Sequence, residues 1–196
     1  IMTTDDGGET WERMEDAPKA GNGEGGFASS GTCVQTAPNG TAWIGTGAGG
    51  NSRLLYTEDY GINWTSNAID MDYGPATGIT SFRFMNGNTG FVTGGDIMND
   101  STYQKNLWFT RNNGGDWKAG ETPTLMGAFY GSSYVKIDGV DVTMVSGPKG
   151  ADISFDLGNT WRNVSTDNLW VNHLLPSGIG WLMGKKGKIL KIEVQP

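Results

Sequence analysis

Apolar residues along this chain occur in short runs between glycine-rich or polar stretches, and no run shows the 3.6-residue period of an amphipathic helix. Such a pattern is typical of β-strands joined by tight turns. It predicts three sets of four strands: 27–37, 41–47, 53–58 and 63–69; 79–85, 90–95, 106–111 and 116–119; 128–137, 140–146, 151–155 and 160–165. Three more strands are predicted at 169–175, 179–184 and 188–194, and residues 1–15 supply two strands of a further set.

Composition agrees with an all-β chain, because 32 glycines and 8 tryptophans occur among its 196 residues. That length suffices for a sizeable core within one domain. A net charge of −7 argues against nucleic acid or an anionic membrane as partner. No apolar run is long enough for a membrane span. One cysteine, Cys33, and one histidine, His173, exclude an internal disulfide and a His/Cys zinc cluster. The sequence also has no G-x-G-x-x-G opening a helix and no flavin motif, so neither metal nor cofactor is expected.

One motif recurs four times, as [Ser/Thr]-x-[Asp/Asn]-x-Gly-x-[Thr/Asn/Asp]-Trp. Its copies are TDDGGETW at 4–11, TEDYGINW at 57–64, TRNNGGDW at 110–117 and SFDLGNTW at 154–161. The tryptophans lie 53, 53 and 44 residues apart, a spacing typical of propeller blades. Only such a repeat explains four matches in one chain of this length.

Each motif position suits a turn between two strands. The Ser or Thr hydroxyl bonds back to the turn, the Asp or Asn oxygen accepts turn N–H groups, and glycine permits positive φ. The tryptophan opens the next strand and packs its ring on neighbouring structure. We therefore expect structural roles for these residues: Asp6, Trp11, Asp59, Trp64, Asn112, Trp117, Asp156 and Trp161.

This motif is the Asp-box, or BNR repeat, so the chain resembles Asp-box β-propellers. The stretches at 23–33 and 42–47 are similar to secreted bacterial propellers described as photosystem II stability/assembly factor-like or sialidase-like. The resemblance implies an all-β propeller with four-stranded antiparallel blades, in which the box lies at the outer edge. It also implies an extracellular or periplasmic location.

The blades are expected within one propeller domain, 1–196. Residues 1–15 end one blade, 16–70, 71–120 and 121–166 form whole blades, and 167–196 form a last blade of three strands. We expect the chain to be the C-terminal part of a ring of about six to eight blades. Alternatively, the strand at 11–15 completes the blade at 169–194 and closes a four-bladed ring. No oligomeric state is predicted.

In propellers of this kind ligands bind over the central channel, which indicates candidate residues on first strands and the loops that enter them. They are Glu24, Ser29, Ser30, Thr32, Arg83, Asp96, Lys149, Asp152 and His173. Glu24, in a glycine-rich approach to a strand, is the candidate acid or base; its alternative is pairing with loop N–H groups. Arg83 is suited to an anionic ligand or to a salt bridge, and His173 to a packed position or to a general base.

Two functions follow from the resemblance. The first is a non-enzymatic binding or assembly propeller that recognises a protein or carbohydrate. The second is a sialidase-like glycoside hydrolase, for which the resemblance implies three clustered arginines, a Tyr/Glu nucleophile pair and an acidic general acid. The chain has five arginines, and Arg13, Arg111 and Arg162 lie in or beside the repeat turns. Only Arg53 and Arg83 are left for such a cluster, so binding is the expected function.

Overall fold

The fold was analysed in a computed structural model that describes residues 1–28, 31–85 and 88–196. These residues form antiparallel sheets and one short 3₁₀ helix, η1 (Lys185–Gly187). The chain opens with a hairpin of two short strands, β1 (Met2–Thr3) and β2 (Glu12–Arg13), called the N-terminal hairpin below. The rest of the chain folds into four larger sheets.

The larger sheets are meanders, since each strand pairs with the next one along the chain. The first sheet consists of β3 (Val34–Ala37), β4 (Thr41–Gly45), β5 (Arg53–Thr57) and β6 (Thr65–Ala68). The second consists of β7 (Thr77–Phe84), β8 (Gly90–Asp96), β9 (Leu107–Thr110) and β10 (Lys118–Ala119). The third consists of β11 (Gly131–Ile137), β12 (Val140–Gly147), β13 (Gly150–Ser154) and β14 (Arg162–Ser165). The fourth consists of β15 (Leu169–Leu174), β16 (Ile179–Gly184) and β17 (Ile189–Glu193).

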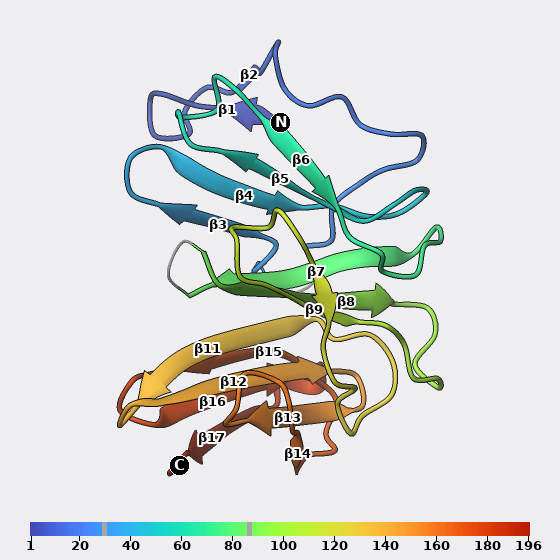
Figure 1. The fold of residues 1–196 in the computed structure, drawn as a ribbon, viewed down its shortest axis with the longest axis vertical. Coiled ribbons are helices and arrows are strands. Elements are labelled where there is room, and N and C mark those ends of the chain that lie inside the picture. The colour runs from blue at the N-terminus through green and yellow to red at the C-terminus, as the bar shows by residue number, and fades with distance from the viewer. Residues whose placement is uncertain (29–30, 86–87) are drawn as a thin grey trace.

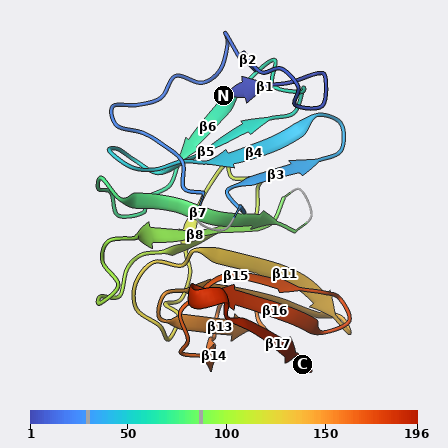
Figure 2. The same cartoon turned by 180° about the vertical axis from the view of Figure 1, so that it is seen from behind.

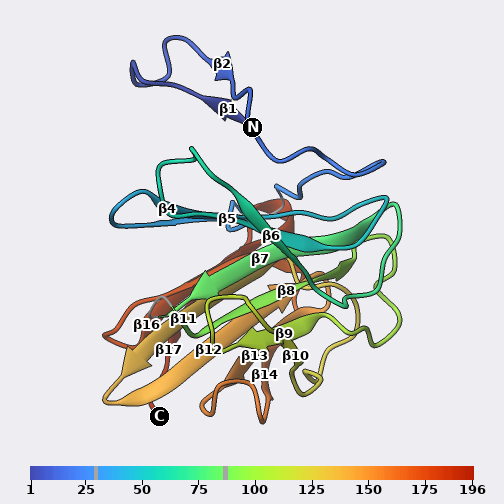
Figure 3. The ribbon, with the colours of Figure 1, turned by 45° about the horizontal axis from the view of Figure 1, so that its top comes forward.

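The sheets follow one another from the N-terminal hairpin at one end of the molecule, and the third and fourth sheets lie together at the other end, one in front of the other (Figures 1 and 2). Neighbouring layers meet along their first strands, because β7 contacts both β3 and β11, and β11 also contacts β15. Figure 3 shows the same succession from a tilted direction. The first strand of each sheet thus lies on the inner side of the stack.

Apolar side chains fill the space between successive sheets. Trp43 and Leu54 of the first sheet share a cluster with Phe82 of the second, and Trp43 stacks on Phe84 with ring centroids 4.5 Å apart. A second cluster joins the second and third sheets, and a third joins the third and fourth. Burial of apolar area of this kind is the main favourable term in folding. Each sheet is therefore stabilised by its neighbours.

Each of the four repeat turns has the same pattern of hydrogen bonds. In the turn at 57–64 the Thr57 hydroxyl donates to Asp59 Oδ1 at 2.9 Å and accepts the Gly61 amide at 2.9 Å. Asp59 Oδ1 accepts the Asn63 amide at 2.8 Å, which is the largest cause of a lowered pKa for that carboxyl. The turns at 4–11, 110–117 and 154–161 repeat these three bonds with their own residues.

The third repeat turn reverses one donor–acceptor pair. Asn63 donates its side-chain amide to Asp59 Oδ2 at 2.7 Å in the second turn. In the third turn Asn112 donates its side-chain amide to Asp116 Oδ2 at 2.9 Å. The two positions have exchanged acid and amide, and the bond between them is kept. Asparagine at 112 is thus compatible with the turn because an aspartate stands four residues later.

Most predicted strands are present within a few residues of their expected bounds, and the chain is all-β as expected. One prediction was wrong: the strand expected at 27–37 is confined to β3. The loop that precedes it is held by the side chain of Glu24 and by a single backbone bridge between Gly25 and Gly47, not by a continuous ladder. The four-bladed alternative is also contradicted. Residues 11–15 contribute β2, which pairs with β1, and in the part of the chain described β17 has no further partner strand.

The exchange between the second and third turns predicts a compensating pair of substitutions. Asp59→Asn alone leaves two amide groups facing each other, so the urea midpoint of unfolding should fall. Adding Asn63→Asp recreates the Asn112–Asp116 arrangement and should recover most of the loss. Urea titrations of the single and double variants measure this coupling. A double variant with the summed losses of the two single ones would contradict the shared network.

Candidate functional site

A chain of hydroxyl groups links the segment just before β3 to the first strands β7 and β11 on the inner side of the stack. The Thr32 hydroxyl donates to Ser81 Oγ at 2.6 Å, and Ser81 Oγ lies 2.5 Å from Ser132 Oγ. Ser81 and Ser132 are fully buried. Buried hydroxyl groups need such partners, so this chain fixes the spacing of the inner strands. The predicted ligand residue Thr32 therefore has a structural contact.

The same polar layer continues between the third and fourth sheets. The Ser133 hydroxyl donates to Asn172 Oδ1 at 2.6 Å, and Asn172 Nδ2 donates to Ser146 Oγ at 2.8 Å. Asn172 is buried, and its amide has both a donor and an acceptor partner. Sequence reasoning missed this residue, because its partners lie 39 and 26 residues away along the chain.

Glu24 lies in a compact cluster that ties the loop before β3 to the first sheet. Its side chain is 6% exposed and forms a two-point ion pair with Arg53, with N–O distances of 2.6 and 2.8 Å. Its carboxylate also accepts the Thr46 hydroxyl and the Gly21 amide, each at 2.6 Å. Arg53 in turn donates to the Lys19 carbonyl at 2.7 Å. The cluster therefore fastens residues 19–24 onto β5.

The electrostatics of Glu24 do not suit a catalytic acid or base. Burial raises the pKa of its carboxyl, but hydrogen bonds from Arg53 and Thr46 outweigh burial and lower the pKa to about 2. A general acid needs a proton near neutral pH, and a general base needs a free oxygen pointing at substrate. All the contacts of Glu24 are those of a structural ion pair, and they do not support the catalytic interpretation.

Arg83 differs from the other candidates because its charge has no acidic partner among the described residues. Of the residues in β7 it alone is not buried. Within residues 1–28, 31–85 and 88–196 its guanidinium makes one hydrogen bond, a donation to the Phe82 carbonyl at 3.1 Å. Burial lowers the pKa of its guanidinium. Arg83 stands two residues beyond Ser81, so both side chains lie on the same face of β7.

The remaining candidates lie apart from one another. Asp96 caps a loop by accepting the Met98 amide at 2.9 Å, and Lys149 pairs with Asp100 at 3.2 Å on the surface. Asp152 is fully buried and accepts both the amide and the hydroxyl of Thr124. His173 is exposed on β15 opposite Trp181. Ser29 and Ser30 lie outside the described residues.

Of the predicted residues, Glu24, Asp96 and Asp152 therefore make structural contacts, and Arg83 is a cation with no acidic partner in the part of the chain that the structure describes. Over the described ranges, no three His, Cys, Asp or Glu side chains are grouped as metal ligands. No helix in these ranges is long and apolar enough to cross a membrane.

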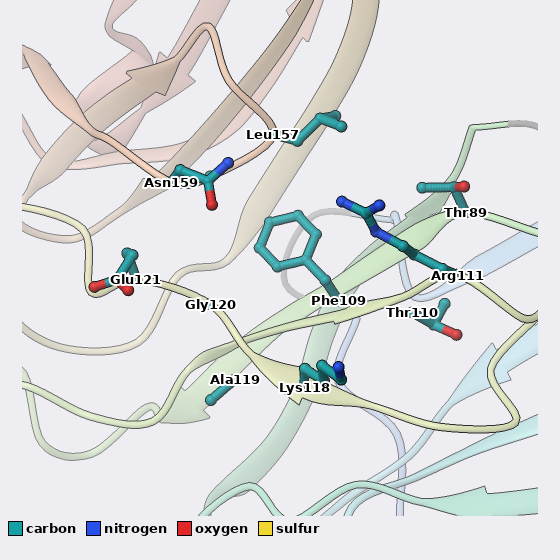
Figure 4. A pocket seen from close by; sticks show the side chains of 11 residues that line it. Thr89, Phe109, Thr110, Arg111, Lys118, Ala119, Gly120, Glu121, Leu157 and Asn159 are labelled. Atoms are coloured by element: carbon teal, nitrogen blue, oxygen red, sulfur yellow. The ribbon is translucent and has the colours of Figure 1, made fainter.

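One concave feature was missed by the sequence analysis. A cleft of about 200 Å³ lies between the β9–β10 side of the second sheet and the repeat turn of the third sheet (Figure 4). Phe109 and Leu157 supply its apolar lining, and Arg111, Lys118 and Glu121 supply its charges. Sequence reasoning assigned Arg111 to an outer edge, which is correct, but could not show that a neighbouring sheet encloses that edge. We call this feature the rim cleft.

Comparisons with known proteins address the fold. No family model and no curated protein matches the sequence. Among solved structures, YCF48 bound to D1 peptide has a TM-score of 0.58 and 18% identity, covering 97% of this chain and 55% of that one. An ancestral GH74 enzyme has a TM-score of 0.58 and 14% identity, covering 85% and 23%. The NanB sialidase from Streptococcus pneumoniae, in complex with a chlorobenzylammonio-ethanesulfonate, has a TM-score of 0.53 and 14% identity, covering 95% and 32%.

The chain has a β-propeller fold. Each four-stranded sheet corresponds to one blade, with its first strand innermost, as the likeness to these structures and the meander order both indicate. At 14–18% identity the likeness concerns the fold alone. The chain spans about half the length of YCF48, 55%, and smaller shares of the two enzymes.

The Glu24 cluster predicts an acid-sensitive contribution to stability. The folded pKa of about 2 lies below the ordinary value of 4.5, so the contribution is complete above pH 4.5 and is lost as pH falls toward 2. Glu24→Gln should lower the free energy of unfolding at pH 7 by about 2 kcal/mol, because a charge-assisted bond set is lost. Urea titrations from pH 7 to pH 2.5 should show the two proteins converging. A constant difference across that range would contradict the ion-pair role.

Proposed function

We propose that this chain is a non-enzymatic binding propeller, which recognises an anionic group of a partner polypeptide at the inner strands. The observation that carries the proposal is Arg83, a partly buried guanidinium on the inner strand β7 with no carboxylate partner among the described residues. A buried or half-buried charge is costly unless it is paired. A carboxylate brought by a ligand would supply that pairing, in the two-point geometry that arginine favours.

The surroundings of Arg83 support a binding role. The hydroxyl chain from Thr32 through Ser81 to Ser132 lies beside it and holds three inner strands at fixed spacing. A guanidinium on such a support is pre-organised, so little conformational entropy is lost when a ligand binds. Val34, on the neighbouring inner strand β3, is 50% exposed and offers apolar contact area.

A polypeptide is the partner class that the comparisons favour. YCF48, whose fold resembles this one, is described as bound to D1 peptide. The similarity is one of fold, so the peptide itself is not transferred to this chain. The acidic balance of −7 argues against a nucleic-acid partner. Carbohydrate stays as the second ligand class, since a glycan carboxylate would meet the same guanidinium.

Three further properties belong to the same proposal. We infer that the repeat turns are Asp-boxes, since all four share the hydroxyl, carboxylate or amide, and glycine contacts described above. The 55% coverage of YCF48 supports a larger ring of about six to eight blades. An extracellular or periplasmic location rests on the sequence resemblance.

The sialidase-like alternative has less support, because the arginines do not gather. Arg53 is paired with Glu24, and Arg162 lies over the ring of Phe155 at 5.1 Å from its centroid. Arg13, Arg83 and Arg111 lie on the N-terminal hairpin, on β7 and in the turn after β9. A triad for a substrate carboxylate would need three guanidinium groups at one place.

Arg83→Met tests the proposed function on a synthetic peptide array with acidic, neutral and basic sequences. The unmodified chain should bind acidic peptides preferentially, and the variant should lose about tenfold in affinity, because a charge-assisted pair is removed. Arg13→Met, an exposed arginine of the N-terminal hairpin, is the matched control and should bind as before. Fluorescence anisotropy of the best peptides gives the affinities.

Two outcomes would overturn this proposal. Equal peptide binding by Arg83→Met and the unmodified chain would exclude Arg83 as the anchor. Turnover of aryl glycosides or sialosides by the chain would replace the binding function with the hydrolase alternative. Circular dichroism spectra of the Arg83→Met variant and the unmodified chain check that both are folded, so that a loss of affinity is not caused by unfolding.

A further inference from the structure

The rim cleft lies on the outer side of the propeller, on strands β9 and β10, whereas Arg83 lies on the inner strand β7. One wall comes from residues 109–111 and 118–121 of the second sheet and its following loop. The other comes from residues 157–159, which belong to the repeat turn of the third sheet. In Figure 4 Arg111 extends beside the Phe109 ring toward Leu157, and Glu121 and Asn159 lie at the far end.

Close packing gives the cleft a fixed shape. Gly158 has φ of +81°, and a Cβ atom built there would come within 2.4 Å of the Phe109 ring. The turn of the third sheet can therefore approach the second sheet only with glycine at this position. The Trp161 indole N–H donates to the Glu121 carbonyl at 3.2 Å and ties the two walls together. The cleft thus exists before any ligand arrives.

The charge of the cleft is opposite to that of the molecule. Arg111 and Lys118 are both exposed, and neither side chain forms a hydrogen bond or ion pair with the described residues. Glu121 supplies one negative charge at the far end, so the lining carries a net positive charge in a chain of net charge −7. Two cations beside an aromatic ring and a leucine suit a ligand that is both anionic and apolar.

The size of the cleft indicates how much of a ligand enters it. About 200 Å³ is below the roughly 300–1,000 Å³ of small-molecule pockets. An adjoining hollow of about 440 Å³ shares Phe109, Arg111 and Lys118 and extends to Asn112 and Asp116. A single apolar side chain fits the cleft, and the chain that bears it can continue over the two cations. A free cofactor would need a larger enclosed space.

We propose that the rim cleft is a second docking site for a partner polypeptide, which takes an apolar side chain flanked by acidic residues. The apolar side chain would lie against Phe109 and Leu157, and the flanking carboxylates would pair with Arg111 and Lys118. The charge complementarity described above carries this choice of occupant. This second site rests on the proposed function only in that the partner is a polypeptide, and binding there needs no contact with Arg83.

Nuclear magnetic resonance titration of the ¹⁵N-labelled chain tests the site directly. The probes are three capped octapeptides with central Glu-Phe-Glu, Gln-Phe-Gln or Lys-Phe-Lys sequences in an otherwise Gly/Ser background. The acidic peptide should shift the amide signals of Gly120, Gly158 and Asn159, and the basic peptide should not. Added salt should weaken the binding, because the cations are exposed.

Variants assign the binding to named side chains. The double variant Arg111→Met/Lys118→Met should lose about tenfold in affinity for the acidic peptide, since two exposed pairs are removed. Leu157→Asn should also weaken it; asparagine tolerates the positive φ of 57° at this position, so the turn should keep its fold. Arg13→Met and Arg83→Met should both leave the shifts at Gly120 and Gly158 unchanged.

Each contrary result overturns this site. Equal affinity for the acidic and neutral peptides would remove the role of the cations. Shifts confined to the surroundings of Ser81 and Phe82 would leave the Arg83 site alone and exclude the cleft. Self-association that disappears in the Arg111→Met/Lys118→Met variant, measured by sedimentation, would identify a second copy of this acidic chain as the occupant in place of a separate partner.

Discussion

The hydrogen bond from the turn backbone to the third-position side chain of each repeat is the interaction on which the architecture depends. In the second and fourth turns an aspartate oxygen accepts the amide four residues later at 2.8 Å, and the first and third turns use bonds of 2.9–3.0 Å. This bond holds the chain while two consecutive residues adopt positive φ, including Leu157 and Tyr60, which rarely do so. Only then can the third and fourth strands of a sheet pair in register.

Layer stacking supplies the stability that single sheets lack. A four-stranded meander has two faces, and its apolar side chains must be buried on both. Here each apolar cluster lies between two neighbouring sheets and buries the facing side of each. The inner strands bring polar groups together at the same time, and buried hydroxyls such as Ser81 and Ser132 bond across sheets. Apolar packing therefore determines the separation of the layers, and the hydroxyl chain determines how their inner strands are aligned.

The sequence predicted the features that depend on local contacts. The side-chain bonds that all four repeat turns share join residues no more than four apart, so the motif contains that shared network. The Glu24–Arg53 ion pair joins residues 29 apart in the sequence, and in the rim cleft Phe109 packs against Gly158 of another sheet. Those contacts depend on which sheets stack and how closely. The strand predicted at 27–37 was too long at its start, because the loop that enters it is positioned by contacts such as that of Arg53 with Lys19, 34 residues apart.

The distribution of arginines separates structural charge from charge that is free for binding. Arg53 forms an ion pair with the buried carboxylate of Glu24, and Arg162 lies over the ring of Phe155. Arg83 and Arg111 have no such partner in the described part of the chain, although 21 acidic residues outnumber 14 basic ones. Arg13 is unpaired in that part of the chain as well, but it is exposed on the N-terminal hairpin. The proposed binding roles of Arg83 and Arg111 therefore rest on their surroundings, an inner strand for Arg83 and the rim cleft for Arg111.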